Sequence, residues 1–273
     1  MLDPAGLHER TDGGAPIPIL SGVLLVCLFV VLAVGGLILV QRLVPMGVRQ
    51  RQNDVAGFIY AVLGVAYAVL LGLMLVAVWE EWEEAKIIAD DEASEVAEIF
   101  WMAHQLPQPE GRRIQELARS YCWVVVEEEW PLMEKGKASP RAWATLDDLR
   151  DSVQSFQPTT DAQLALYQEA LGRMDELADA RRERLLAADE GLPGILWVVL
   201  IIGGVFVVGF TYLFGMENNL THVLMVATLA LIISLALFTV AALNYPFMGD
   251  VHVAPEAFEQ VLERFEISDL SDL

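Results

Sequence analysis

The sequence predicts an all-α polytopic membrane protein in which a helical polar domain separates two pairs of membrane spans. The chain is 55% hydrophobic and yet has a formal net charge of −21, so apolar and charged residues must be concentrated in different segments. A helix needs about 20 apolar residues to cross the hydrocarbon core of a bilayer. Four stretches meet that length: Ile17–Val40, Val55–Trp79, Pro193–Phe214 and Thr221–Leu243. No segment alternates apolar and polar residues over a sustained length, so no strands are predicted.

The first 79 residues are predicted to form a flexible leader and a first transmembrane hairpin. Residues 1–16 are rich in proline and glycine, which is typical of an irregular leader. Residues 17–79 hold two spans joined by a short connection. The first span differs from a cleaved signal peptide, because its apolar run is too long and the region before it is not basic. Small residues predict a seam of close helix approach along the second span: Gly57, Gly64, Ala68 and Gly72.

Residues 80–192 are predicted to form a helical acidic domain. The second span should continue into it without a break, as an amphipathic helix that reaches about Gln105. The apolar stripe of that helix consists of Trp82, Ala85, Ala89, Ala93, Val96 and Phe100. Three more helices follow, and the first of them is expected to stop before Pro131, since proline cannot continue a helix. Four carboxylates on the face opposite the stripe are expected to be solvated in a single chain: Glu81, Glu84, Glu92 and Glu95.

Residues 193–244 are predicted to form a second transmembrane hairpin, and residues 245–273 a C-terminal segment. Both termini and the acidic domain then share one side of the membrane. Counting Arg and Lys near the span ends slightly favours that side as cytoplasmic. Arg outnumbers Lys, which is common in proteins from GC-rich bacterial genomes. We therefore expect the membrane to be a bacterial inner membrane.

The sequence contains no recognisable catalytic or metal-binding constellation. The motifs HExxH, GxSxG, GxxxxGK[ST] and CxxC are absent, and Cys27 and Cys122 indicate neither a disulfide framework nor a metal site. We therefore predict no enzymatic activity, no cofactor and no metal. The acidity argues against nucleic acid as a partner. The second span carries no charge and no span has a proline at its centre, which disfavours a transporter. A channel can instead be gated by an apolar constriction.

Two segments of the chain resemble bestrophins. Residues 62–85 are similar to their second transmembrane segment, an apolar helix that ends in a tryptophan-bearing polar turn, here with Trp79 and Trp82. The sequence NYPFMGDVHVAPEAFE is similar to the motif that follows their last span. The chain is more similar still to bacterial and plant bestrophin-like membrane proteins of unknown function. The residues that carry this similarity are Glu92, Glu129, Trp130, Pro131, Arg181, Arg184, Pro246, Phe247 and Gly249.

The resemblance implies a homo-oligomer, namely a pentamer around a central pore lined by the second span. Animal bestrophins conduct anions and some bacterial relatives prefer cations. Counted back from Trp79, the apolar neck falls on these positions: Ala61, Val65, Val69 and Gly72. In a ring of subunits, Glu80, Glu81 and Glu84 would surround the exit of the neck and concentrate cations.

We therefore expect a cation-preferring or weakly selective ion channel whose partners are itself, membrane lipid and inorganic ions. Calcium gating is not expected, because only Asp250 directly follows Gly249, where animal bestrophins have several consecutive acids that help to bind calcium.

A second hypothesis is a non-conducting scaffold or sensor, anchored in the membrane, that binds a partner through its acidic domain. Uncharged spans suit it equally well. A closed ring with an axial opening would favour the channel, and a monomer or dimer without a pore would favour the scaffold. An enzyme that acts on a lipid is a more distant alternative, because the chain shows no nucleophile and base set.

Overall fold

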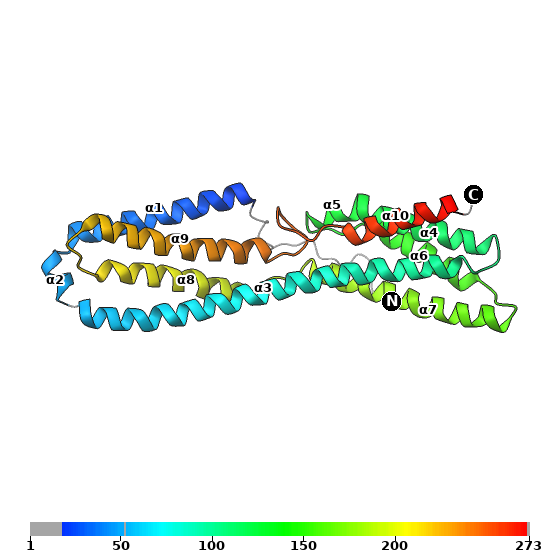
Figure 1. Ribbon diagram of the computed structural model, residues 1–273, viewed down its shortest axis with the longest axis horizontal. Coiled ribbons are helices and arrows are strands. Elements are labelled where there is room, and N and C mark those ends of the chain that lie inside the picture. The colour runs from blue at the N-terminus through cyan, green and yellow to red at the C-terminus, as the bar shows by residue number, and fades with distance from the viewer. Residues whose placement is uncertain (1–17, 52, 272–273) are drawn as a thin grey trace. The chain divides into compact units, whose positions relative to one another are not determined.

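The computed structural model describes residues 18–51 and 53–271, which form two compact units (Figure 1). The membrane unit consists of the described residues up to Glu80 together with Gly191–Asn244. The helical unit consists of Glu81–Glu190 together with the residues from Tyr245 onward. The described ranges contain helices, turns and irregular segments but no strand, which agrees with the predicted all-α class. The predicted leader, residues 1–16, lies outside them.

The membrane unit contains the four predicted spans. Its elements are α1 (Ile19–Leu43), the short α2 (Met46–Gln50), the first part of α3 (Asn53–Ala103), α8 (Gly194–Phe210) with the 3₁₀ turn η2 (Thr211–Leu213), and α9 (Asn219–Leu243). Four of these helices are long and apolar enough to cross a membrane. The start of α9 is capped by Asn218, whose side-chain oxygen accepts from Leu220 N at 3.0 Å and from Thr221 N at 3.2 Å. The predicted number of apolar helices long enough to span a membrane is confirmed.

Close helix contacts in the membrane unit form at glycines of α1 and α8. A Cβ added at Gly22 would lie 2.0 Å from the ring of Phe238, and one added at Gly203 would lie 2.8 Å from the ring of Tyr67. The Tyr67 hydroxyl also donates to Leu200 O at 2.9 Å, which holds α3 against α8. By contrast, a Cβ at Gly64 or Gly72 would meet no described atom within 4 Å. These two glycines of the predicted seam therefore make no close contact inside a single chain.

The helical unit is a bundle around one apolar core. Its elements are the second part of α3, α4 (Glu110–Val124), the π-helical turn η1 (Val125–Glu129), α5 (Trp130–Met133), α6 (Pro140–Ser155), α7 (Asp161–Ala187) and α10 (Glu256–Ser271). Ser139 caps α6 by accepting from Ala142 N at 3.2 Å, and Thr160 caps α7 by accepting from Gln163 N at 3.2 Å. Helix α10, which packs on α4, was not foreseen in the C-terminal segment.

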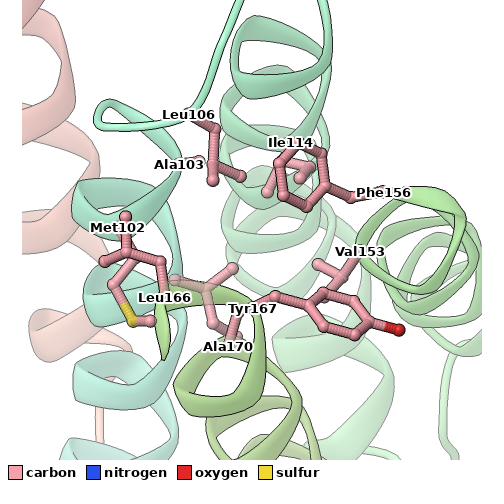
Figure 2. Close-up of a pocket in the computed structure, with 10 residues that line it drawn as sticks. Met102, Ala103, Leu106, Ile114, Val153, Phe156, Leu166, Tyr167 and Ala170 are labelled. Atoms are coloured by element: carbon pink, nitrogen blue, oxygen red, sulfur yellow. The ribbon is translucent and has the colours of Figure 1, made fainter. Parts of the chain in front are cut away.

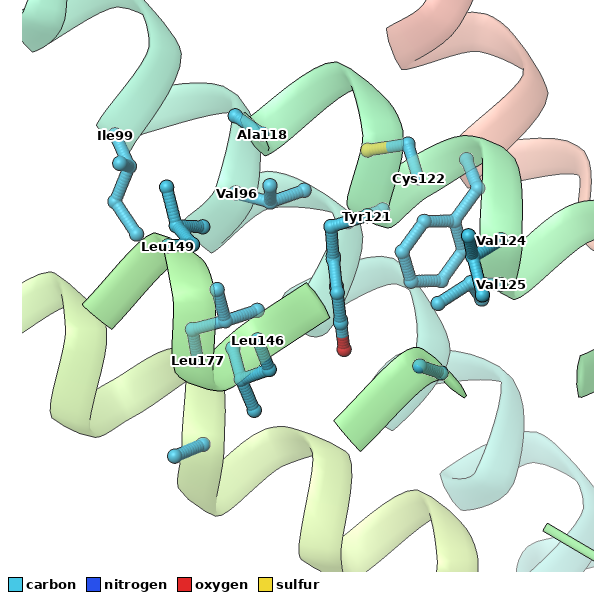
Figure 3. Close-up of a cluster of buried hydrophobic side chains, with 14 of the residues drawn as sticks. Val96, Ile99, Ala118, Tyr121, Cys122, Val124, Val125, Leu146, Leu149 and Leu177 are labelled. Atoms are coloured by element: carbon cyan, nitrogen blue, oxygen red, sulfur yellow. The ribbon is translucent and has the colours of Figure 1, made fainter. Parts of the chain in front are cut away.

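The predicted stripe of α3 lies in this core. Ala85, Ala89, Ala93, Val96 and Phe100 are each at most 2% exposed, and Trp82 is partly buried against them. Figure 3 shows Val96 of α3, Tyr121 of α4, Leu149 of α6 and Leu177 of α7 among the side chains that meet there. Helix α3 runs from Asn53 to Ala103 without a break, as the sequence predicts.

The expectation that a helix stops before Pro131 was wrong. The chain stays helical from Glu110 to Met133, because η1 widens the helix just before the proline. In a regular α-helix the ring of Pro131 would collide with the carbonyl four residues earlier, and proline has no N–H to donate. The π turn, in which Trp130 N bonds to Val125 O, changes the register there. It also turns Glu129 into the core, where its side chain is fully buried.

Candidate functional site

The helical unit buries two carboxylates and two guanidinium groups together. We call Glu92 of α3, Glu129 of η1, and Arg181 and Arg184 of α7 the buried charge cluster. All four side chains have 0% exposure. Their formal charges cancel, which is the condition under which buried ions are tolerated.

The buried charge cluster is held by paired, charge-assisted hydrogen bonds. Arg181 donates to both carboxylate oxygens of Glu129, from Nη1 at 2.7 Å and from Nη2 at 2.6 Å. Arg184 donates to both oxygens of Glu92, from Nε at 2.5 Å and from Nη2 at 3.0 Å. Arg184 Nη2 also lies 2.7 Å from Glu129 Oε2 and so links the two pairs. Such bidentate pairs are the strong class of protein hydrogen bonds.

Further groups complete the hydrogen bonding of these carboxylates. The Tyr121 hydroxyl donates to Glu92 Oε1 and accepts from Arg181 Nη1 at 3.2 Å. The backbone N–H of Ser139 donates to Glu129 Oε1 at 3.1 Å. Burial alone would raise the pKa of Glu129, but Arg184 and Arg181 outweigh it, so this pKa lies below its usual value of 4.5. Burial, reinforced by Glu92, raises the pKa of Tyr121 well above 10.0.

Aromatic rings enclose the two guanidinium groups. The guanidinium carbon of Arg181 lies 4.6 Å from the ring centroid of Trp143, and that of Arg184 lies 5.0 Å from the ring centroid of Trp130. Trp130 packs edge-on against Phe247 and Phe258, at centroid distances of 5.7 and 5.8 Å. The rings exclude water and strengthen the ion pairs inside them.

The Pro-Phe-x-Gly sequence brings the chain to this cluster. Phe247 is fully buried against Trp130, and Pro246 accepts from Val253 N at 2.7 Å. Gly249 has φ 79°, a conformation that residues with a Cβ rarely adopt. Trp130 Nε1 donates to Val253 O at 2.9 Å and so joins this turn to α5.

The structure therefore gathers most of the residues that carried the resemblance, although they come from distant parts of the sequence. Eight of them meet in or beside the buried charge cluster: Glu92, Glu129, Trp130, Arg181, Arg184, Pro246, Phe247 and Gly249. The other three lie outside it, since Pro131 is exposed, Trp82 is partly buried and Trp79 is 51% exposed in the single chain. A closed and neutral cluster of this kind orients helices. Nothing in its geometry supports catalysis.

The prediction of a solvated Glu92 was wrong. Glu92 precedes the core residue Ala93 and lies at the edge of the apolar stripe, where arginines of α7 reach it. The predicted position opposite the stripe was also wrong, because at 3.6 residues per turn Glu92 lies only about 20° around the helix from Ala85. Its partners on another helix could not be read from the spacing. Sequence reasoning also gave no role to Tyr121, Trp143 and Phe258. Their only signal was membership of an apolar stripe or an aromatic side chain.

The predicted neck residues lie together on one face of α3. Ala61, Val65, Val69 and Gly72 fall within an arc of about 80° at 3.6 residues per turn. All four are exposed in the single chain, with Val65 at 66% and Val69 at 57%. The predicted ring residues Glu80, Glu81 and Glu84 are exposed as well.

Two hollows in the helical unit offer no evident ligand site. One, of about 350 Å³, is lined by Glu81 and Glu84 of α3 and by Glu183 and Glu190, and no group of His, Cys, Asp or Glu within the described ranges is arranged to hold a metal ion. The other, shown in Figure 2 between Met102, Ile114, Phe156 and Tyr167, has a volume of about 10 Å³. This second hollow is apolar and barely the size of one water molecule.

Comparison with known proteins identifies the fold. A mutant of a bacterial bestrophin homologue from Klebsiella pneumoniae aligns over 89% of this chain and 99% of its own, with 17% identity and a TM-score of 0.63. A second structure of a Klebsiella pneumoniae homologue aligns over 92% and 97%, with 16% identity and a TM-score of 0.61. A structure described only as that of a membrane protein with one substitution aligns over 89% of this chain and 97% of its own, with 14% identity and a TM-score of 0.66.

No match was found among curated proteins. At identities of 14–17%, the structural matches show the fold alone. The family model described as the Bestrophin-like domain matches residues 27–258, which is most of the chain. This integral membrane protein therefore belongs to the bestrophin-like family.

Proposed function

We propose that this protein is a homo-oligomeric ion channel whose pore is lined by α3. The observation that carries the proposal is the exposed apolar face of α3, with Ala61, Val65, Val69 and Gly72, in a helix that passes without interruption into exposed carboxylates. A long apolar face that the chain itself does not cover either contacts lipid or lines the central axis of a ring of subunits. The resemblance to bestrophins, which implies a pentamer around a central pore, favours the ring.

In this proposal five copies place the apolar face around a narrow neck. A ring of apolar side chains passes ions when it wets and blocks them when it dries. Two segments each cross the membrane twice, namely residues 17–79 and residues 193–244. The cytoplasmic side of a bacterial inner membrane then holds residues 80–192 together with residues 245–273.

The carboxylates beyond the neck supply the selectivity. Glu80 lies only about 20° around the helix from the Val69 edge of the apolar face, whereas Glu81 lies about 120° from it. In the single chain, Glu81 and Glu84 line the acidic hollow with Glu183 and Glu190. Five copies of Glu80 would concentrate cations at the exit of the neck. The channel is therefore cation-preferring or weakly selective and performs no enzymatic reaction.

Reversal potentials of the purified protein in planar bilayers under a salt gradient test this proposal. We expect the reversal potential of the wild type to be shifted from zero toward the equilibrium potential of the cation. The Glu80→Gln, Glu81→Gln and Glu84→Gln triple variant should reverse nearer zero, with Glu80→Gln alone causing most of the shift. The matched control is Asp147→Asn, Asp148→Asn and Asp151→Asn on α6, which removes the same number of exposed charges.

Three results would overturn parts of the proposal. Reversal at the chloride potential would refute cation preference. Equal shifts in the α3 and α6 variants would refute a role for the ring. A purified protein that is a monomer, or that passes no current, would refute conduction and favour the scaffold hypothesis.

A further inference from the structure

The membrane unit has an open groove that the proposed pore does not use. It has a volume of about 640 Å³, within the range of ligand pockets in proteins. We call it the membrane groove. Its lining residues are Asn53 and Tyr60 of α3, Thr211, Phe214 and Met216 in and after η2, and His222, Leu224, Met225, Val226, Thr228, Leu229 and Ile232 of α9.

The polar side chains at one end of the membrane groove are already engaged within the chain. Asn53 donates to Gly215 O at 2.9 Å and accepts from Gly215 N at 3.0 Å. His222 lies 3.1 Å from Thr211 O through Nε2 and 3.3 Å from Gln41 Nε2 through Nδ1. The Thr211 hydroxyl donates to Val208 O at 2.5 Å. The end of the groove is therefore preformed, and its occupant is not selected by hydrogen bonds to these three groups.

Apart from Thr228 and the Tyr60 hydroxyl, the rest of the membrane groove is lined by apolar side chains. Met225 and Ile232 are 58% and 60% exposed on α9, and the ring of Tyr60 packs edge-on against Phe214 at a centroid distance of 5.8 Å on the opposite wall. From His222 to Ile232 the helix advances by about 15 Å at 1.5 Å per residue. This length is half of the roughly 30 Å hydrocarbon core, the depth that one leaflet occupies.

The charge at the polar end suits a phospholipid. Three arginines lie from the last turn of α1 to the start of α3: Arg42, Arg49 and Arg51. The acidic residues of the segments that meet at this end are Asp54 in the first turn of α3 and Glu217 just before α9. Arg49 is 7% exposed and donates from Nη1 to Phe214 O at 3.2 Å, so its positive charge lies directly behind the wall of the groove. Positive charge at the end of an apolar groove attracts an anionic phosphate headgroup.

We propose that the membrane groove holds one acyl chain of a membrane phospholipid, whose headgroup lies at the Asn53 end. The groove runs about 15 Å along α9, half the length of a spanning helix, so it suits one acyl chain better than a transmembrane helix of a second copy. The amphipathic order of the groove, polar at the membrane surface and apolar toward the centre, matches a lipid in one leaflet. The proposal does not depend on ion conduction.

Photolabelling tests it directly. The protein would be reconstituted into vesicles of phosphatidylethanolamine and phosphatidylglycerol that contain a phospholipid with a diazirine in its acyl chain. After illumination, mass spectrometry of peptides locates the label. We expect more label on residues 224–232 of α9 and around Tyr60 than on α1. Helix α1 is a fair comparison, because its Leu28 and Leu32 are 52% and 62% exposed, much like the exposed groove residues of α9.

A filled groove provides the second arm of the test. Met225→Trp combined with Leu229→Trp occupies the groove and should reduce the label around Tyr60 and Phe214 by about tenfold, because the acyl chain loses its packing contacts. The matched control is Leu28→Trp with Leu32→Trp, which has the same spacing on an exposed face of α1. It should leave the groove label unchanged.

Other outcomes would overturn the proposal. Equal labelling of all exposed spans would mean ordinary solvation by lipid. An unlabelled groove, together with disulfide formation between copies of a Met225→Cys variant, would assign the groove to a second copy of the chain. If the double Trp variant does not fold, the labelling pattern of the wild type decides the question by itself. Both readouts are independent of current, so they stand or fall separately from the channel proposal.

Discussion

Arg181 and Glu129 form a bidentate ion pair in the core of the helical unit, with N–O distances of 2.7 and 2.6 Å and no exposure of either side chain. The two residues are 52 positions apart in the sequence. Neither could be buried alone, because an unpaired charge in an apolar core is strongly unfavourable. The pair therefore requires α7 and the π turn to dock together.

Removing one arginine should destabilise the helical unit strongly. Arg181→Met removes two of the hydrogen bonds to the Glu129 carboxylate and the one that the Tyr121 hydroxyl accepts. It leaves two carboxylates against one arginine in the buried charge cluster, so we expect a loss of about 3–5 kcal/mol of unfolding free energy. Urea unfolding of the detergent-solubilised protein, followed by tryptophan fluorescence, measures it. Arg182→Met is the control, since Arg182 is exposed and pairs with Asp179 only at the surface. Similar losses in both variants would contradict a structural role for the buried charge cluster.

The stability of the helical unit should fall in acid partly through Glu129. Its folded-state pKa lies below the usual 4.5, so the ionised carboxylate stabilises the fold at higher pH. This contribution is lost as the pH falls below about 4.5 and through the folded-state pKa. Glu129→Gln should be less stable at neutral pH and should lose less stability on acidification. Urea midpoints across this range measure the difference, with Glu128→Gln, a partly exposed neighbour, as control. An equally steep acid loss in Glu129→Gln and in the wild type would refute the assignment.

Two glycine-to-alanine changes should have opposite effects. Gly249→Ala places a Cβ on a residue with φ 79°, and the strain should cost roughly 1–2 kcal/mol. Gly172 lies in α7, where an added Cβ meets no described atom within 4 Å. Gly172→Ala should therefore stabilise the unit by about 0.4–1 kcal/mol. The same urea titrations measure both, and a stabilising Gly249→Ala would contradict the turn described here.

A polar residue on the proposed neck should ease ion passage. Val65→Thr keeps the shape of the side chain but replaces one methyl group with a hydroxyl that favours wetting of the constriction. We expect single-channel conductance to rise on the order of threefold, equivalent to about 0.65 kcal/mol of barrier. Val31→Thr on α1 is the control, because Val31 and Val65 are both 66% exposed in the single chain. If the two variants conduct alike, Val65 does not line the neck.

The sequence by itself determined the four spans, the all-helical class and the unbroken helix that runs from the membrane into the acidic domain. These features depend on the length of apolar runs and on helical periodicity, which are local properties of the sequence. The spacing of Ala85, Ala89 and Val96, for example, shows the buried face of a helix without any knowledge of the helices that pack against it. Only the tertiary structure decided that Glu92 is buried, that the chain stays helical through Pro131 and that the motif residues form one cluster. The reason is physical: Glu92 and Arg184 are 92 positions apart, and whether a charged residue is solvated or buried depends on a partner that another helix brings to it.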